Sequence, residues 1–269
     1  MGDVRFGPSG LPAGSFEEAA SELATSGYRA CEIGFAGGFW LDYDTAPQLA
    51  AALQAHDIVL SVHAPLAAFM GHVAREKKFK MALGMLDHTA GLAKAAGAEV
   101  IVFHPGFLLE REREQAIADV VDQLGDLRAR LESKDRLVPF GIEVMGRVRE
   151  LGTLDDVLEI ASEVDFVRPV LDFAHMHATS DGAYTDVEMF ATALEMTDDV
   201  MRDGERFHIH FSDIAYANRN ETKHLRYGEG TLRVDGLRDA LARFERPATV
   251  ISESPDAAST HAIREVLLG

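Results

Sequence analysis

The amino-acid sequence predicts one (β/α)₈ barrel, and three observations lead to this fold. Short apolar runs alternate eight times with segments of helical periodicity, which is the pattern of parallel β-α-β units. The runs are almost continuously apolar, as expected of strands that are covered on both faces. The length of 269 residues is typical of this barrel, and no linker or change of composition interrupts the alternation. We therefore expect residues 1–269 to form a single domain.

Eight strands are predicted from runs rich in β-branched and aromatic side chains. In chain order they cover residues 4–7, 30–35, 59–64, 100–105, 140–145, 169–175, 207–212 and 249–254. Because eight strand–helix units follow one another without a break, a closed barrel is favoured over an open sheet.

Helices are predicted between these strands. Ser15 and Glu18 form a capping-box pattern before the first helix, which should end at Gly27, and Thr153 with Asp156 repeats that start signal before the fifth. Apolar residues recur at helical spacing in several other segments. These segments cover residues 74–96, 110–131, 185–201, 234–244 and 256–268.

Composition excludes several classes of protein. There is no run of about 18 apolar residues and no signal-peptide pattern, so we expect a cytoplasmic protein without a membrane partner. The single cysteine, Cys31, excludes an intrachain disulfide and a zinc finger. A formal net charge of −18 argues against a broad basic surface for polyanions, and it suits a monomer whose copies repel one another.

Six successive predicted strands each carry a histidine, aspartate or glutamate near the C-terminal end. Those strand ends meet at one mouth of a barrel, where active sites of this fold lie. Imidazole and carboxylate groups are the ligands that zinc and manganese take. One such residue has an ordinary structural explanation, but six strands ending alike favour a metal centre. His208 shares a strand face with His210, and we expect it one layer deeper. The candidate ligands on these strands are His63, His104, Glu143, Asp172, His175, His210 and Glu253.

The motifs around these residues resemble those of the endonuclease IV family, the family 2 apurinic/apyrimidinic endonucleases, within the xylose-isomerase-like barrel superfamily. The resemblance follows the chain in order and covers nearly all of it. Its more specific part joins Asp172 and His175 to the later segment His224–Gly230. The matching motifs are Ser-Val-His-Ala-Pro, Phe-His-Pro-Gly, Ile-Glu-Val-Met-Gly, Asp-Phe-Ala-His, His-Phe-Ser-Asp, His-Leu-Arg-Tyr-Gly-Glu-Gly and Ser-Glu-Ser-Pro.

The resemblance implies a ligand set, since the family uses three zinc ions. His63 and His104 would bind the first ion, and Glu143 would bridge it to the second. Asp172, His210 and Glu253 would complete the second site, while His175 and His224 would hold the third. The family adds an aspartate two residues before the last histidine, where this chain has Thr222 preceded by Glu221. Either Glu221 substitutes, or water fills the gap, or the third site is weaker. Two or three zinc ions are therefore expected, with manganese as an alternative.

The activity implied by the resemblance is cleavage of double-stranded DNA 5′ to abasic sites, a step of base excision repair. Closely spaced metal ions supply hydroxide at neutral pH and stabilise the leaving oxygen. Glu143 would be the catalytic residue, since it would hold two ions and orient the attacking hydroxide. The products would be a 3′-hydroxyl and a 5′-deoxyribose phosphate.

Candidate substrate-binding residues lie in the loops that follow the strands. Arg147 and Arg149 follow the fifth strand, Arg219, Lys223 and Arg226 follow the seventh, and further bases at positions 75–80 follow the third. Together they predict a basic rim on an acidic body, with DNA binding that weakens as salt rises.

Two loops depart from the family pattern. Gly38 replaces an expected arginine, and Leu66 replaces a tyrosine, at positions that the family inserts into the duplex. Phe39, Trp40 or Phe69 could insert or stack instead, but packing in the core or within its loop explains Trp40 at least as well.

The main alternative is a sugar isomerase or epimerase built on the same barrel with a single metal. Glu143, Asp172, His210 and Glu253 would supply its ligands, and the remaining histidines would have no task. Those histidines favour the hydrolase, and they make a non-catalytic metal-binding protein the weakest of the three alternatives. The number of bound ions separates the hydrolase from the isomerase.

Overall fold

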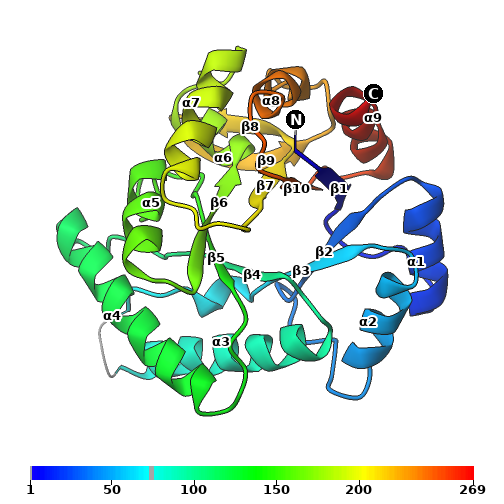
Figure 1. The fold of residues 1–269 in the computed structure, drawn as a ribbon. Coiled ribbons are helices and arrows are strands. Elements are labelled where there is room, and N and C mark those ends of the chain that lie inside the picture. The colour runs from blue at the N-terminus through cyan, green and yellow to red at the C-terminus, as the bar shows by residue number, and fades with distance from the viewer. Residues whose placement is uncertain (1, 73–75) are drawn as a thin grey trace.

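A computed structural model describes residues 2–72 and 76–269, and it confirms the predicted barrel. Eight parallel strands form one sheet in the order β1-β10-β7-β6-β5-β4-β3-β2, seen as a ring in Figure 1. The strands are β1 (Val4–Pro8), β2 (Ala30–Gly34), β3 (Val59–His63), β4 (Val100–Phe103), β5 (Phe140–Glu143), β6 (Val167–Asp172), β7 (Phe207–Phe211) and β10 (Ala248–Ser252).

The ring closes where β1 meets β2. The amide of Gly10 donates to the carbonyl of Glu32 at 2.6 Å, and Ser9 and Glu32 form a parallel bridge. Gly7 allows this approach, because a Cβ atom at its position would lie 1.5 Å from the carbonyl oxygen of Ala30. A side chain at this position would therefore force the first and second strands apart.

Helices surround the barrel on the outside (Figure 1). Both predicted capping boxes are present, at Ser15 and at Thr153. The predicted helix over 74–96 is described from Lys77 onward, and Ala74 and Arg75 lie outside the described residues. The outer helices are α1 (Phe16–Thr25), α2 (Ala46–Gln54), α3 (Lys77–Ala95), α4 (Arg113–Glu132), α5 (Leu154–Glu163), α7 (Val187–Asp198), α8 (Val234–Leu241) and α9 (Ala257–Leu268).

The prediction that the sixth strand extends to His175 was wrong. The strand ends at Asp172, and His175 lies in helix α6 (Phe173–Thr179). The cause is local, because the Asp172 carboxylate accepts a hydrogen bond from the amide of His175 at 2.8 Å and so caps a helix. The turn moves the imidazole of His175 from the strand to the first turn of a helix above the mouth.

A two-stranded hairpin was not predicted. Strands β8 (Asp213–Ala217) and β9 (Asn220–Leu225) pair antiparallel directly after β7. Several contacts attach the hairpin to the loop after β5. They include a bridge between Arg147 and Asn220, a hydrogen bond of 2.8 Å from the Glu221 amide to the Gly146 carbonyl, and one of 3.2 Å from the Val148 amide to the Asn220 side chain. The hairpin therefore brings residues 220–225 over the mouth of the barrel.

The apolar core includes large aromatic side chains from the strands. Phe6, Phe103, Phe140 and Phe207 are almost fully buried. Among the described residues, no helix combines the length and the apolarity needed to cross a membrane.

Candidate metal centre

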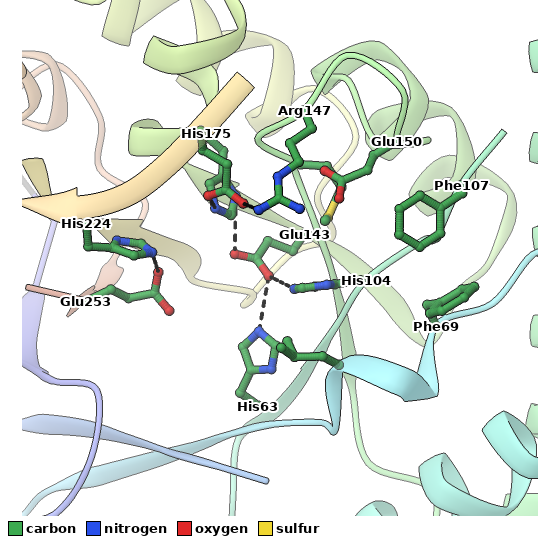
Figure 2. Close-up of a pocket in the computed structure, with 14 residues that line it drawn as sticks. His63, Phe69, His104, Phe107, Glu143, Arg147, Glu150, His175, His224 and Glu253 are labelled. Atoms are coloured by element: carbon green, nitrogen blue, oxygen red, sulfur yellow. Dashed lines mark hydrogen bonds and ion pairs between the residues drawn. The ribbon is translucent and has the colours of Figure 1, made fainter. Parts of the chain in front are cut away.

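Glu143 lies at the centre of the candidate site, at the C-terminal end of β5. Its two carboxylate oxygens face different partners. Oε2 lies 2.9 Å from Nε2 of His104 and 3.2 Å from Nε2 of His63, whereas Oε1 lies 3.0 Å from Nδ1 of His210. Figure 2 shows Glu143 between His63, His104 and His175. A carboxylate in this position can offer one oxygen to each of two neighbouring cations.

His63, His104 and Glu143 form the first group, in which ligand atoms from the three residues lie within 4.8 Å of one another. The Nδ1 atom of His63 lies 2.9 Å from the carbonyl oxygen of Ala64, so Nδ1 donates there and leaves Nε2 free to bind a cation. This arrangement fixes the tautomer of a metal-binding histidine.

Glu143, Asp172, His210 and Glu253 form a second and more deeply buried group. One oxygen of Asp172, Oδ2, is buried without a hydrogen bond in the part of the chain that the structure describes. Burial, together with the charges of Glu253 and Glu143, raises the pKa of Asp172 to about 8 despite the nearby His175 and His210. A buried carboxylate oxygen of this kind is satisfied by a cation, so the donor set fits a divalent metal.

His175, Glu221 and His224 form a third group. Nδ1 of His175 donates to the carbonyl of Val144 at 2.8 Å, and Nε2 lies 3.0 Å from Oε2 of Glu221. His224 is oriented by a 2.6 Å hydrogen bond between its Nδ1 atom and the hydroxyl of Ser212. The hairpin therefore puts the Glu221 carboxylate beside His175, although the sequence left three alternatives open at this position.

Charges within the site are strongly coupled. Burial alone would lower the pKa of His63, but the hydrogen bond and charge of Glu143 raise it to about 9. The pKa of His210 lies well above its usual value of 6.5 because the charges of Glu32, Glu253 and Glu143 outweigh the effect of burial. Conversely, the histidines around Glu143 hold the pKa of that buried carboxyl well below 4.5. Protons on the imidazoles thus balance the carboxylates, and divalent cations can do the same.

The three groups open into a pocket of about 340 Å³. Leu66, Phe69 and Phe107 form an apolar part of its wall, while Arg147 and Glu150 line it beside Met145. In Figure 2, Phe69 and Phe107 lie on the side of the pocket away from His224 and Glu253. The rings of Phe69 and Phe107 meet edge to face, with their centroids 5.1 Å apart. The pocket can therefore hold a molecule with one charged and one apolar face.

The predicted substrate-binding residues fall into two sets. Leu66 and Arg147 line the pocket, and Arg147 makes an ion pair of 3.4 Å with Glu221. Trp40 instead lines a separate hollow between the loop after β1 and the end of β2, and its indole N–H donates to the carbonyl of Gly34. Lys223 is exposed on β9, and Arg226 is paired with Asp256. The structure does not bring these last three residues into the pocket.

Two buried carboxylates near the site were missed by sequence reasoning. Glu150 lines the pocket, and burial raises the pKa of its carboxyl. Glu32 lies beneath the pocket on β2 and contacts His208 and His210. A signal for Glu32 was available, because a charged residue in a strand covered on both faces needs a buried partner.

Comparisons with known proteins point to one family. A family model described as "Xylose isomerase-like TIM barrel" matches residues 20–267. An uncharacterised protein of Methanocaldococcus jannaschii is 29% identical over 254 residues, which cover 93% of this chain and 91% of that protein. A probable endonuclease 4 of Oceanobacillus iheyensis is 29% identical over 150 residues, or 54% of this chain. The match spans about half of that relative, namely 48% of its length.

Solved structures with the same fold carry different names. A D-tagatose 3-epimerase-like protein superposes with a TM-score of 0.75 at 20% identity, covering 98% of this chain and 96% of that one. Endonuclease IV from Thermus thermophilus superposes with a TM-score of 0.72 at 17% identity, covering 98% and 97%. At these identities the likeness concerns the barrel alone, so the choice between activities depends on the residues at the mouth.

Proposed function

Because the chain belongs to the xylose isomerase-like TIM barrel family, we propose that it is a zinc-dependent phosphodiester hydrolase of the endonuclease IV type. Its substrate in this proposal is double-stranded DNA with an abasic site, cleaved on the 5′ side during base excision repair. The relatives named as probable endonuclease 4 support this choice of chemistry.

One observation carries the proposal. Three groups of potential metal ligands line a single mouth, and Glu143 belongs to two of them. A single-metal enzyme needs only the group of Glu143, Asp172, His210 and Glu253. The additional histidines, His63, His104, His175 and His224, are explained if two or three ions bind together.

The residues of the chain have distinct tasks in this proposal. Bound divalent ions lower the pKa of water and neutralise charge on phosphoryl oxygens, which is the chemistry that phosphodiester hydrolysis requires. Glu143 is the proposed catalytic residue, since its two oxygens set the spacing of the first two groups and orient the attacking water. His63 and His175 keep one nitrogen free for a cation, because Nδ1 of each donates to a backbone carbonyl.

The wall of the pocket suits part of a nucleotide. The Arg147 guanidinium can pair with a phosphate, and Phe69 and Phe107 can pack against the apolar face of a deoxyribose ring. Contact with a longer duplex would involve the exposed residues Arg149, Arg219 and Lys223 around the mouth. Because these contacts are ionic, DNA binding should weaken steeply with salt.

The proposal is tested by two measurements on one preparation. Metal analysis of the purified protein should find two or three ions per chain, and a duplex containing one tetrahydrofuran abasic analogue should be cut once, leaving a 3′-hydroxyl. An intact duplex serves as the control. Cleavage of both duplexes at the same rate, or of neither with two or more ions bound, would contradict the proposed activity.

A single-metal sugar isomerase or epimerase is the second candidate. The observation that favours it is the enclosed group of Glu143, Asp172, His210 and Glu253, which is sufficient for one ion. The barrel also superposes on a D-tagatose 3-epimerase-like protein. One bound ion per chain, together with epimerisation of free ketoses such as D-tagatose, would favour this activity over the hydrolase.

A further inference from the structure

Glu32 is a fully buried carboxylate that the proposed chemistry does not use. It lies on β2, and its side chain crosses the barrel interior to reach β7, which is not a neighbour of β2 in the sheet. An isolated carboxylate at such a position would be very unfavourable, so its partners must stabilise the charge. The partners of Glu32 therefore indicate its role.

Three donors from two strands converge on the Glu32 carboxylate. The Ser61 hydroxyl donates to Oε2 at 2.7 Å, and Nε2 of His208 lies 3.2 Å from the same oxygen. Nε2 of His210 faces both oxygens, at 3.1 Å from Oε1 and 3.3 Å from Oε2. All four side chains are buried, so these contacts are shielded from water.

The contact with His210 has a consequence for the metal centre. Because a carboxylate only accepts hydrogen bonds, Nε2 of His210 donates to Glu32, and Nδ1 donates to Glu143 until a cation replaces the Nδ1 proton. Nδ1 lies 3.0 Å from Oε1 of Glu143 and 3.6 Å from Oε1 of Glu253. Glu32 thus holds the ring on its Nε2 side, while Nδ1 points into the group of candidate ligands.

We propose that Glu32 is a positioning residue of the metal centre, which fixes the tautomer and the orientation of His210 so that Nδ1 binds a divalent cation together with Glu143, Asp172 and Glu253. A carboxylate behind a metal-binding histidine also increases the basicity of the ring. The inference depends on the proposed metal centre, but not on whether the substrate is DNA or a sugar.

A separate ion held by Glu32, His208 and His210 is the competing interpretation, since their potential ligand atoms also lie within 4.8 Å of one another. Both sites would need His210. A neutral imidazole has one free nitrogen, so it serves one of the two ions. The group of Glu143, Asp172, His210 and Glu253 offers four residues rather than three, and a zinc site usually has four ligands. Binding at Nδ1 is therefore favoured.

The test compares Glu32→Gln with Ser61→Ala in the full-length protein. Glu32→Gln keeps the size of the side chain and removes its charge, whereas Ser61→Ala removes a hydrogen bond to the same carboxylate without touching His210. Zinc affinity measured by chelator competition should fall about 10- to 100-fold in Glu32→Gln. It should stay within about twofold of wild type in Ser61→Ala. The visible spectrum of the cobalt-loaded protein should change only in Glu32→Gln.

Three outcomes would overturn the inference. Glu32→Gln could bind zinc as tightly as the wild type and show only a lower melting temperature without metal, as a purely structural residue would. Ser61→Ala could lose as much affinity as Glu32→Gln, which would indicate general loosening of the core. Alternatively, Glu32→Gln could lose one whole ion while the affinity of the others is unchanged, as expected if Glu32 itself bound an ion.

A measurement on the wild-type protein tests the same inference without requiring that the variants fold. In the cadmium-loaded wild type, nitrogen NMR should show His210 coupled to the metal through Nδ1, with Nε2 protonated. Coupling through Nε2 would refute the role of Glu32 while leaving the metal centre intact. Failure of the wild type to bind zinc, cobalt or cadmium would instead contradict the metal centre itself, and with it this inference.

Discussion

Two buried carboxylates in this molecule are stabilised in different ways. Asp87 on α3 is surrounded by the permanent cations of Arg130, Lys134 and Arg136. Arg130 lies on α4, and the other two lie in the turn after it. Glu143 at the mouth of the barrel is surrounded by imidazoles, whose charge depends on a bound proton. The side chains of both carboxylates are almost fully buried, at 4% and 1% exposed.

The difference teaches how to distinguish a structural charge from a functional one. Both oxygens of Asp87 are paired, with Arg130 at 2.8 Å and Arg136 at 3.0 Å, so nothing else need bind there. At the mouth, the buried Oδ2 atom of Asp172 has no hydrogen bond among the described residues, its ion-pair partner is the titratable ring of His175 at 3.3 Å, and its neighbours Glu143 and Glu253 add negative charge. A carboxylate cluster balanced by exchangeable protons can exchange them for metal ions, whereas a cluster balanced by arginine and lysine cannot.

The largest expected effect is the loss of activity caused by a substitution at the mouth of the barrel. Glu143→Gln removes the carboxylate shared by the first two groups. Loss of a residue that only orients a metal ligand lowers metal affinity or activity by ~10- to 100-fold. Loss of a shared ligand should therefore lower the rate of cleavage of the abasic duplex by more than about 100-fold. DNA binding should persist, because Arg147 and the exposed bases remain. Single-turnover cleavage and a mobility-shift titration measure the two effects. A variant that cleaves at a rate near that of the wild type would refute the assignment of Glu143.

Asp87→Asn should show the opposite behaviour. Loss of charge-assisted hydrogen bonds costs about 2 kcal/mol of the free energy of unfolding, which corresponds to a melting temperature lower by roughly 4–8 °C. The number and affinity of bound ions should stay the same. Calorimetry measures the melting temperature, and metal analysis measures the bound ions. A loss of metal from Asp87→Asn would contradict the assignment of Asp87 as a purely structural charge.

Asp87 should also make the free energy of unfolding depend on pH. Burial opposes ionisation of Asp87, but hydrogen bonds from Lys134, Arg130 and Arg136 bring its pKa below the usual 3.8. Because the pKa of Asp87 is lower in the folded protein than in the unfolded chain, its ionisation stabilises the fold above pH 3.8. This stabilisation is lost as the pH falls through the pKa of the folded protein. The stability difference between wild type and Asp87→Asn should therefore be constant near neutrality and shrink below pH 3.8. A difference that grows on acidification would contradict this sign.

A smaller effect is expected at the third group. Glu221→Gln removes the carboxylate beside His175, so one ion should bind at least about tenfold more weakly while the others are retained. Glu150→Gln is the matched control, because Glu150 lines the same pocket but belongs to none of the ligand groups. Metal titration distinguishes the two variants. Equal losses in both would mean that the pocket, rather than a specific ligand, was disturbed.

The smallest effect concerns substrate binding. Arg147→Ala should weaken DNA binding several-fold and reduce the salt slope of the binding constant by about one, as loss of one phosphate contact does. Arg149→Ala, two residues away and exposed outside the pocket lining, should change binding less. Titrations at several salt concentrations test both variants. An unchanged slope in Arg147→Ala would remove Arg147 from the DNA-binding surface.

Much of the fold could be predicted from local patterns. The eight strands begin within two residues of their predicted starts, because apolar runs covered on both faces have a clear signature. The capping boxes at Ser15 and Thr153 are also local and were recognised. The end of β6 was misjudged, since Asp172 acts at once as the last strand residue and as the cap of α6. Apolar pattern alone does not distinguish these two roles.

The sequence by itself determined the barrel and which strand ends carry imidazole and carboxylate groups, because periodicity and residue type are local properties. Only the tertiary structure decided which of those groups share a cation site. It turned Glu221 toward His175 through an unpredicted hairpin, and it brought Glu32 of β2 against His210 of β7. Such contacts join residues far apart in the chain, such as Glu32 and His210, so their geometry depends on the strand register and curvature of the whole barrel.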